Sequence, residues 1–327
     1  MNKTTGNMNK TVNGKTAFMR GMLLCLLAIA GCDGNKIYEK EMYRPVLYML
    51  SNGANNVYTV VIPFGDTGVT TSFSIGCGGS LSNPEEAVIE LEPDTVLYDM
   101  YNRINFDDSA SYARLLPQYR YEIPSMTVSM PAASHDQYVE VPVYISQNGL
   151  SPDSVYFIPL AIKSVSRYEV NPDSRNILFR VAVENTYAEQ INTTIYYQRG
   201  TMTSGGQLLP VNGSTVLQPL SKNEVRMFAG TRIQTAQSTL DEINTYSIVA
   251  KINADSSVVV VPYGTIDVEQ LDGENYNRYY TRINAEGRKV DYFDLHYRFR
   301  TLKSTEPGVY GEWTEIRESL QRISLHD

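Results

Sequence analysis

The chain has 327 residues, of which 42% are hydrophobic and 20% charged, with 24 tyrosines but a single tryptophan. This composition is too apolar for a disordered protein, and the length suffices for about two domains that each bury a core. The formal net charge of −8 argues against nucleic acid as a partner, because that affinity depends on neutralising phosphates.

The first 31 residues indicate a bacterial lipoprotein signal peptide. They contain four basic residues and no acidic one, then the apolar run Gly21–Ala30, which is shorter than the roughly 20 residues that a permanent membrane helix needs. Ile29-Ala30-Gly31-Cys32 follows and resembles a lipobox. We therefore expect a lipid anchor on Cys32, with residues 32–42 as a tether. The alternatives are an ordinary cleaved signal peptide or a buried segment with an incidental cysteine.

Residues 43–186 show repeated alternation of apolar and polar residues, which is typical of half-buried strands. Turn signals such as Ser51-Asn52-Gly53 separate the runs, and the pattern predicts an antiparallel, immunoglobulin-like β-sandwich. Helical spacing is scarce, and Thr95–Ile104 is the segment that favours a helical turn. The apolar faces of four strands are Tyr58/Val60/Ile62/Phe64, Val139/Val141/Val143/Ile145, Tyr156/Ile158/Leu160/Ile162 and Ile177/Phe179/Val181/Val183.

A change of character near Glu184–Gln190 separates a second domain, residues 187–327, in which short strands resume. In the clearest of them, Asp291–Arg300, Phe293 and its alternate neighbours point one way and Asp294, His296, Arg298 and Arg300 the other. The end, Trp313–Ile323, fits both helical and strand spacing, and we interpret it as a closing strand. Together these strands predict an antiparallel β-barrel or a second sandwich. The other expected strands are Thr194–Met202, Val216–Leu220, Glu224–Ala229, Tyr246–Ile252, Ser257–Tyr263, Thr265–Gln270 and Tyr276–Ile283.

The order of several motifs resembles a known pair of domains. Leu97–Asn102, Leu115–Pro117, Tyr121–Pro124 and Tyr156–Ile162 resemble, in that order, the N-terminal domain-of-unknown-function family of Bacteroidetes cell-surface lipoproteins. The second half is similar to the C-terminal domain often paired with it, through Ser221–Arg226, Tyr279–Ile283 and Tyr292–Phe299.

The resemblance covers about residues 40–325. It implies an immunoglobulin-like first domain and a barrel-like or lipocalin-like second one. It also implies display on the outer membrane and a place in a polysaccharide-utilisation system, beside an outer-membrane importer and its glycan-capturing lipoprotein.

Three triplets of Asp, then Ser or Thr, then an apolar residue resemble O-glycosylation sites of exported Bacteroidetes proteins. They would place a glycan on Thr95, Ser109 and Ser154. Each triplet is equally compatible with an ordinary turn or helix cap.

Patterns for catalysis are absent from the sequence. Three histidines and three cysteines show no zinc-ligand spacing, and there is no nucleophile elbow or phosphate-binding glycine loop. We therefore expect no cofactor, no metal and no enzymatic activity, although spacing alone does not exclude two facing carboxylates of a glycosidase.

A binding role needs aromatic rings for sugar faces and polar groups for hydroxyls. Gly273–Arg282 is the richest such segment, and with the single tryptophan it gives the candidate ligand-binding residues Tyr276, Arg278, Tyr279, Tyr280 and Trp313. The alternative is that these tyrosines only pack a sheet edge with wet hydroxyls.

The leading hypothesis from the sequence is a non-catalytic outer-membrane lipoprotein that binds a polysaccharide or oligosaccharide. The alternatives are a surface adhesin that contacts another protein without binding sugar, and a carrier of small molecules with a lipocalin-like cavity.

Overall fold

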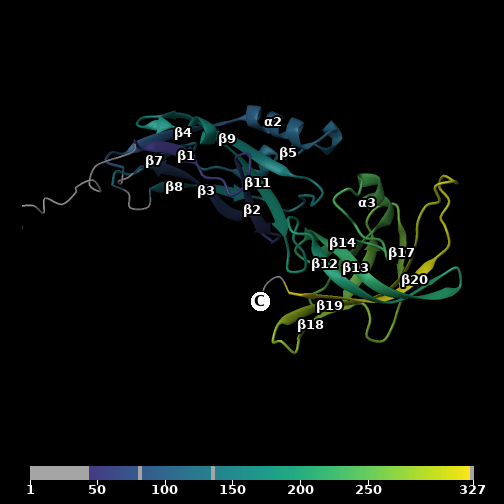
Figure 1. Cartoon of the computed structure of the whole chain (residues 1–327). Coiled ribbons are helices and arrows are strands. Elements are labelled where there is room, and N and C mark those ends of the chain that lie inside the picture. Colours follow the sequence, from purple (N-terminus) through teal and green to yellow (C-terminus); the bar gives the residue numbers. More distant parts are fainter. Residues whose placement is uncertain (1–43, 80–82, 134–136, 325–327) are drawn as a thin grey trace, which may run out of the picture.

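The computed structural model describes residues 44–79, 83–133 and 137–324. The predicted signal peptide, the lipidation site Cys32 and the tether lie outside the described residues. The rest forms two β-rich units in succession, the first purple to teal and the second green to yellow in Figure 1. The all-β prediction, a sandwich followed by a barrel, is confirmed.

The first unit is built from two facing sheets. Their strand orders are β10-β1-β3-β8-β6 and β2-β11-β9-β4-β7, with β5 also paired to β9. The strands are β1 (Val46–Met49), β2 (Val57–Pro63), β3 (Val69–Gly78), β4 (Ala87–Pro93), β5 (Arg114–Leu115), β6 (Tyr121–Glu122), β7 (Thr127–Met130), β8 (Tyr138–Ile145), β9 (Tyr156–Val165), β10 (Glu169–Val170) and β11 (Asn176–Glu184).

The alternating apolar residues meet between the two sheets. Phe73 and Phe179 touch edge to face with centroids 5.9 Å apart, and both are fully buried. The expectation of a purely antiparallel sandwich was wrong in one respect. β11 pairs with β2 in parallel, and so do β1 with β10 and β5 with β9. Alternation reports which face is buried and carries no information on the direction of the partner strand.

The helix α2 (Thr95–Asn105) lies outside the sandwich, next to β9 and β11. It begins where Asp94 accepts hydrogen bonds from the backbone N–H groups of Val96 and Leu97, as an N-cap residue does. Leu97 is buried against the sheet, and Tyr98 and Tyr101 of the same helix pack there with it. The predicted helical turn at Thr95–Ile104 is thus a three-turn helix.

The second unit is one strongly bent sheet of nine strands, in the order β16-β15-β14-β13-β12-β20-β19-β17 with β18 also paired to β19. It is a nearly closed barrel, because Ser257 beside β16 and Arg278 of β18 form a bridge, and Gln270 of β17 accepts the N–H of Val260 in β16 at 2.8 Å. The strands are β12 (Thr194–Ser204), β13 (Gln207–Ser221), β14 (Glu224–Phe228), β15 (Ser247–Ile252), β16 (Val258–Pro262), β17 (Asp267–Gln270), β18 (Arg278–Ile283), β19 (Lys289–Arg300) and β20 (Thr314–Ile323).

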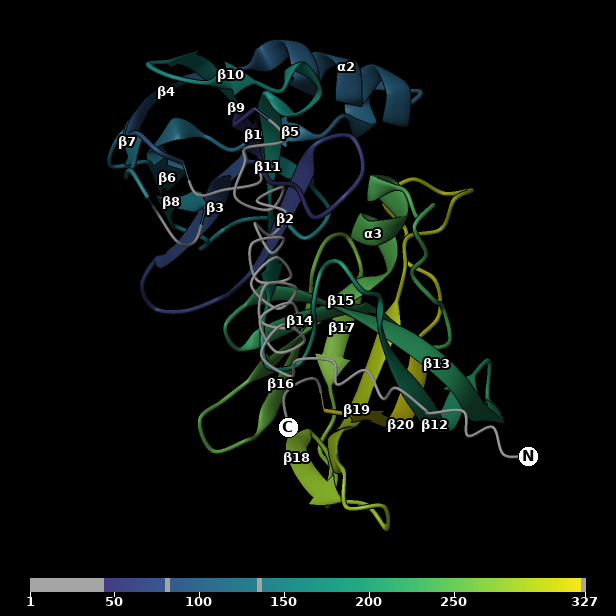
Figure 2. The same ribbon diagram turned by 60° about the vertical axis from the view of Figure 1, so that its left-hand side comes forward.

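A short helix, α3 (Leu240–Tyr246), lies at the end of the barrel nearest to α2 in both views (Figures 1 and 2). It starts with a capping box in which Thr239 and Glu242 bond each other's backbone N–H groups. The barrel interior holds a continuous apolar core that includes Phe293, Leu295 and Leu320. Tyr187, just after β11, already belongs to this second core.

The two units are joined by polar contacts. Arg226 of β14 is completely buried and makes a two-pronged ion pair with Asp153 of the first unit. Burial alone would lower the pKa of Arg226, but the bonds to Asp153 hold it above its usual value. A second pair, Lys222 with Asp66 at 2.6 Å, is exposed. Across the described part of the chain, no helix combines the length and apolarity needed to cross a membrane.

Candidate site on the outer face of the barrel

Strand alternation in the barrel puts one set of side chains in the core and the other on the outer face. In β19 the core set is Phe293, Leu295, Tyr297 and Phe299. The outward set therefore contains Tyr292, Asp294, His296, Arg298 and Arg300. Residues that pair directly across antiparallel strands share a face, so the register of the neighbouring strands completes the outer surface.

One line of outward residues crosses four strands. Tyr280 of β18 pairs with Tyr292 of β19, and Tyr292 pairs with Gln321 of β20. Gln321 in turn pairs with Tyr197 of β12. We call these four residues the tyrosine row. Neighbouring strands are about 4.8 Å apart, so the row extends about 14 Å over three steps.

The two ends of the row differ in how they are held. The rings of Tyr280 and Tyr292 are parallel, with centroids 5.0 Å apart and an interplanar angle of 5°. The guanidinium groups of Arg278 and Arg282 each lie 4.9 Å from the Tyr280 centroid. Burial and a hydrogen bond with Asp294 raise the pKa of Tyr280. At the other end, Tyr197 is 64% exposed.

The row has a polar flank and an apolar flank. On one side the same register places a polar line on the outer face: Arg278, Asp294, Ser319 and Arg199. On the other side, a more apolar line begins at Arg282 and continues through Val290 and Ile323. Ile195, two residues before Tyr197 on the same face, completes it and is 48% exposed.

This arrangement suits a flat polyhydroxylated ligand. Tyr292 keeps one ring face that Tyr280 does not cover, and Tyr197 is 64% exposed, so an apolar sugar face can lie against these two rings. The amide of Gln321 and the polar flank supply donors and acceptors for hydroxyl groups. A pre-organised pair of rings loses little entropy on binding.

Two of the predicted residues, Tyr280 and Arg278, belong to this surface. Tyr279, between them, points the other way. Its hydroxyl donates to Asp291 at 2.8 Å, and its ring packs against Phe293 at 5.0 Å and Tyr187 at 4.9 Å. Burial, followed by the bond to Asp291, raises the pKa of Tyr279. Tyr279 therefore has no ring face free for a ligand on the outer surface.

Tyr276 and Trp313 lie away from the tyrosine row. Tyr276 packs against His296 at 5.6 Å, about 13 Å along the strand direction from Tyr280. Trp313 precedes β20 and is eight residues from Gln321, which is about 26 Å along a strand. The guanidinium groups of Arg298 and Arg300 lie 4.6 Å and 4.4 Å from its ring. The predicted set thus does not form one compact site.

The sequence reasoning missed Tyr292, Gln321 and Tyr197. Tyr292 and Tyr197 both alternate with core residues in expected strands, which is the available signal. What brings them beside Tyr280 is the pairing of four strands that are up to about 125 residues apart.

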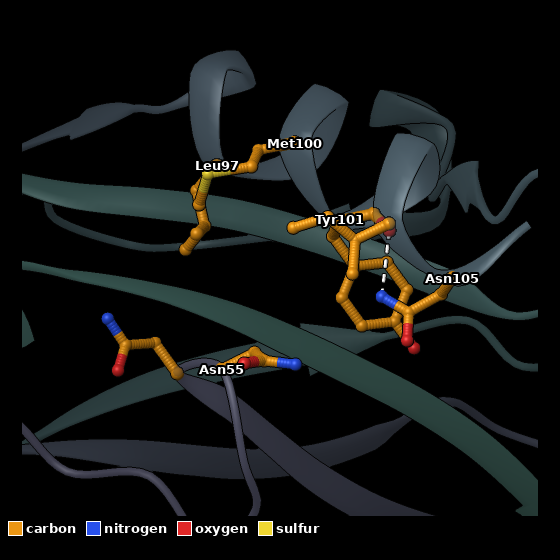
Figure 3. Close-up of a pocket in the computed structure, with 7 residues that line it drawn as sticks. Asn55, Leu97, Met100, Tyr101 and Asn105 are labelled. Carbon is orange, nitrogen blue, oxygen red and sulfur yellow. Dashed lines mark hydrogen bonds between the residues drawn. The ribbon is translucent and has the colours of Figure 1, made fainter.

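A small hollow lies between α2 and the residues that precede β2. Asn55, Leu97, Met100, Tyr101 and Asn105 line it together with Asn56 and Ile104 (Figure 3), and its volume is about 130 Å³. Pockets for small-molecule ligands are usually about 300–1,000 Å³. A wider, open hollow of about 430 Å³ beside Thr95 is lined by groups that already bind one another, such as Asn176 and Asp94 at 2.9 Å.

In residues 44–79, 83–133 and 137–324, no three His, Cys, Asp or Glu side chains gather closely enough to hold an ion. His296 is buried, and both of its ring nitrogens already have hydrogen-bond partners. Its Nδ1 lies 2.8 Å from the Asp272 carbonyl oxygen and its Nε2 lies 2.9 Å from Glu315. The hydrogen bond to His296, assisted by Arg317, lowers the pKa of Glu315.

Solved structures share this two-domain fold. A protein of unknown function from Bacteroides ovatus is 16% identical over 85% of this chain and 94% of its own, with a TM-score of 0.66. A multidomain protein including DUF1735 from the same organism is 16% identical over 85% and 94%, with a TM-score of 0.59. An auxiliary nutrient binding protein from Bacteroides thetaiotaomicron is 12% identical over 84% and 93%, with a TM-score of 0.58. No curated protein matches the chain.

Two family models match the chain in succession. Residues 38–169 match a model described as an N-terminal domain, and residues 175–321 match one described as C-terminal. The first range covers most of the sandwich, and the second covers its last strand, β11, together with the barrel. The chain is thus similar, in succession, to an N-terminal and a C-terminal family domain.

Proposed function

We propose that this chain is a non-catalytic glycan-binding protein whose ligand lies on the tyrosine row. The observation that carries the proposal is the line Tyr280, Tyr292, Gln321 and Tyr197 across four strands of the barrel. It combines aromatic faces with polar groups on the outer face of the barrel, where Tyr197 is 64% exposed and the other three residues are half-buried. A glycan is a ligand class that this combination suits, because sugar rings have apolar faces and polar hydroxyl groups.

The wider setting is part of the same proposal. A lipid on Cys32 would hold the protein at the outer membrane, where it would assist an importer and a glycan-capturing lipoprotein. The proposal is supported by the likeness of the fold to an auxiliary nutrient binding protein from Bacteroides thetaiotaomicron. It is supported further by the absence of catalytic motifs from the sequence.

The test is affinity electrophoresis of the chain from residue 33 onward through gels that contain plant, microbial or host polysaccharides. One class of polysaccharide should retard the protein. Tyr197→Ala and Tyr292→Ala should abolish the retardation, because each removes a ring of the row. Tyr119→Ala is the matched control, since this tyrosine is 79% exposed and lies in the other domain. Retardation by no polysaccharide would refute the proposal.

A protein-binding role is the second candidate, and one observation favours it. Val96, Met100 and Ile104 of α2 are 75%, 47% and 68% exposed and follow one another at intervals of four, so they form an apolar stripe on one helix face. An adhesin or a subunit of an uptake complex would use such a stripe. Crosslinking in the native membrane should then capture a partner, and Ile104→Lys should remove it while sugar binding is unaffected.

A further inference from the structure

We propose that the ligand of the tyrosine row is an acidic saccharide, with Arg199 and Arg282 binding its carboxylate or sulfate groups. This inference rests on the proposed function and narrows its ligand class. It comes from the charges around the row.

The arginines on the four strands of the row fall into two groups. Five are paired with an acid: Arg278 with Asp294, Arg298 with Glu269, Arg300 with Asp267, Arg317 with Glu315 and Arg322 with Asp291. Arg199 and Arg282 are exposed, and neither has an acidic partner among the residues that the structure describes. Arg199 and Arg282, the two arginines without an acidic partner, are also the two that lie two residues from Tyr197 and Tyr280 of the row.

Their positions fit an extended ligand. Arg282 follows Tyr280 by two residues on the same face, and Arg199 follows Tyr197 by two residues on the same face. The two arginines thus lie at opposite ends of the row and on opposite flanks, about 19 Å apart along the diagonal. A short run of linked acidic sugars that rests on the rings would place its anionic groups near both.

The local charge opposes that of the whole protein. The chain has a net charge of −8, so it repels anionic polymers at long range. Around the row the charged side chains are Arg199, Arg278, Arg282 and Asp294, which together are positive. A guanidinium can bind a carboxylate or sulfate through two parallel hydrogen bonds, which is stronger than bonding to a neutral hydroxyl. Neutral glycans need no such groups.

The experiment uses two forms of one polymer, polygalacturonate and its fully methyl-esterified form, with dextran sulfate and dextran as a second pair. Isothermal titration at low salt should give about tenfold or tighter binding to the charged member of one pair. Arg199→Gln and Arg282→Gln should each weaken that binding by about tenfold, and salt should weaken it too. A preference for polygalacturonate assigns a carboxylate, and one for dextran sulfate assigns a sulfate.

Arg103→Gln is the control, because it removes one exposed positive charge from the other domain and should leave the affinity unchanged. The inference is overturned if a neutral polymer binds as tightly as its charged form and the Arg variants bind normally. The proposed function survives that result if Tyr197→Ala still abolishes binding. If no polymer in a broad panel binds, the proposed function and the inference fail together.

Discussion

Glu318 gives the barrel a pH-dependent stability that one substitution should remove. Its side chain is 1% exposed and points into the barrel, where Gln198 donates to one carboxylate oxygen and the Tyr297 hydroxyl donates to the other at 2.9 Å. No cation pairs with it among the described residues. Burial therefore raises the pKa of Glu318 from 4.5 to about 7, against the opposing effect of these two hydrogen bonds.

The size of the pH effect on stability follows from the raised pKa of Glu318. Between pH 4.5 and 7 the folded protein holds a proton on Glu318 that the unfolded chain has lost, so the free energy of unfolding falls as the pH rises. At about 1.4 kcal/mol per pH unit, the loss amounts to about 3 kcal/mol between pH 4.5 and pH 8. Glu318→Gln is nearly isosteric and carries no charge, and like the protonated acid it offers one carbonyl oxygen as an acceptor and one donor group in place of the second oxygen. It should match the wild type near pH 4.5 and exceed its stability by about 3 kcal/mol at pH 8.

The assay is urea unfolding followed by the fluorescence of Trp313, which is the only tryptophan in the chain and reports on the barrel. The quantity to compare is the stability difference between variant and wild type at pH 5 and pH 8. Glu312→Gln, at an exposed position outside the strands, is the control and should leave the pH dependence unchanged. Parallel pH curves for the wild type and Glu318→Gln would refute the reasoning.

Three further predictions concern the joint between the units, a strand crossing and a modification site. Arg226→Leu should lower the free energy of unfolding by about 3–5 kcal/mol, because it leaves the largely buried carboxylate of Asp153 without its cation. Lys222→Ala at the exposed pair should cost less than about 1 kcal/mol in the same urea titration, and equal costs would contradict the account. Gly200→Ala should destabilise the barrel, since its Cβ would lie within 2.8 Å of the Glu318 Cα and closer still to the Arg317 carbonyl oxygen, whereas Gly213→Ala has 3.9 Å of space and should be neutral by thermal unfolding. Ser154 should carry no glycan, because it is half-buried beside the buried ion pair of Asp153, and peptide mass spectrometry that finds sugar there would refute this.

Most strands of the fold can be predicted from the local alternation of apolar and polar residues, and the elements that the prediction missed have physical causes. The strand Asp291–Arg300 was expected within two residues of its observed start, because its alternation is unbroken. The first half of β13 was missed, since Pro210 and Gly213 interrupt its pattern. The capping box of Thr239 and Glu242 was a usable signal for α3, but that helix is only seven residues long. The parallel pairing of β2 and β11 depends on a distant partner, and alternation does not encode it.

The candidate site likewise contains residues that local sequence pattern could identify and residues that only long-range strand pairing brings together. Tyr280 and Arg278 were expected to bind ligand, and both lie on the outer face of the barrel. Tyr279 was expected to bind ligand, but strand alternation turns it to the core, where Asp291 holds its hydroxyl. Tyr197 could be found only through register, because 83 positions separate it from Tyr280 in the sequence and two strands separate them in the sheet.

Tyr197 also offers the most direct test of the central claim. It is 64% exposed and has no ring contact or side-chain hydrogen bond with another described residue, so Tyr197→Ala should change the free energy of unfolding by less than about 0.5 kcal/mol. The measurement is the dissociation constant of this variant for the polysaccharide that retards the wild type. A loss of about tenfold or more, with normal stability, is the result that the tyrosine row predicts. An unchanged dissociation constant would contradict the account and place any glycan site elsewhere on the protein.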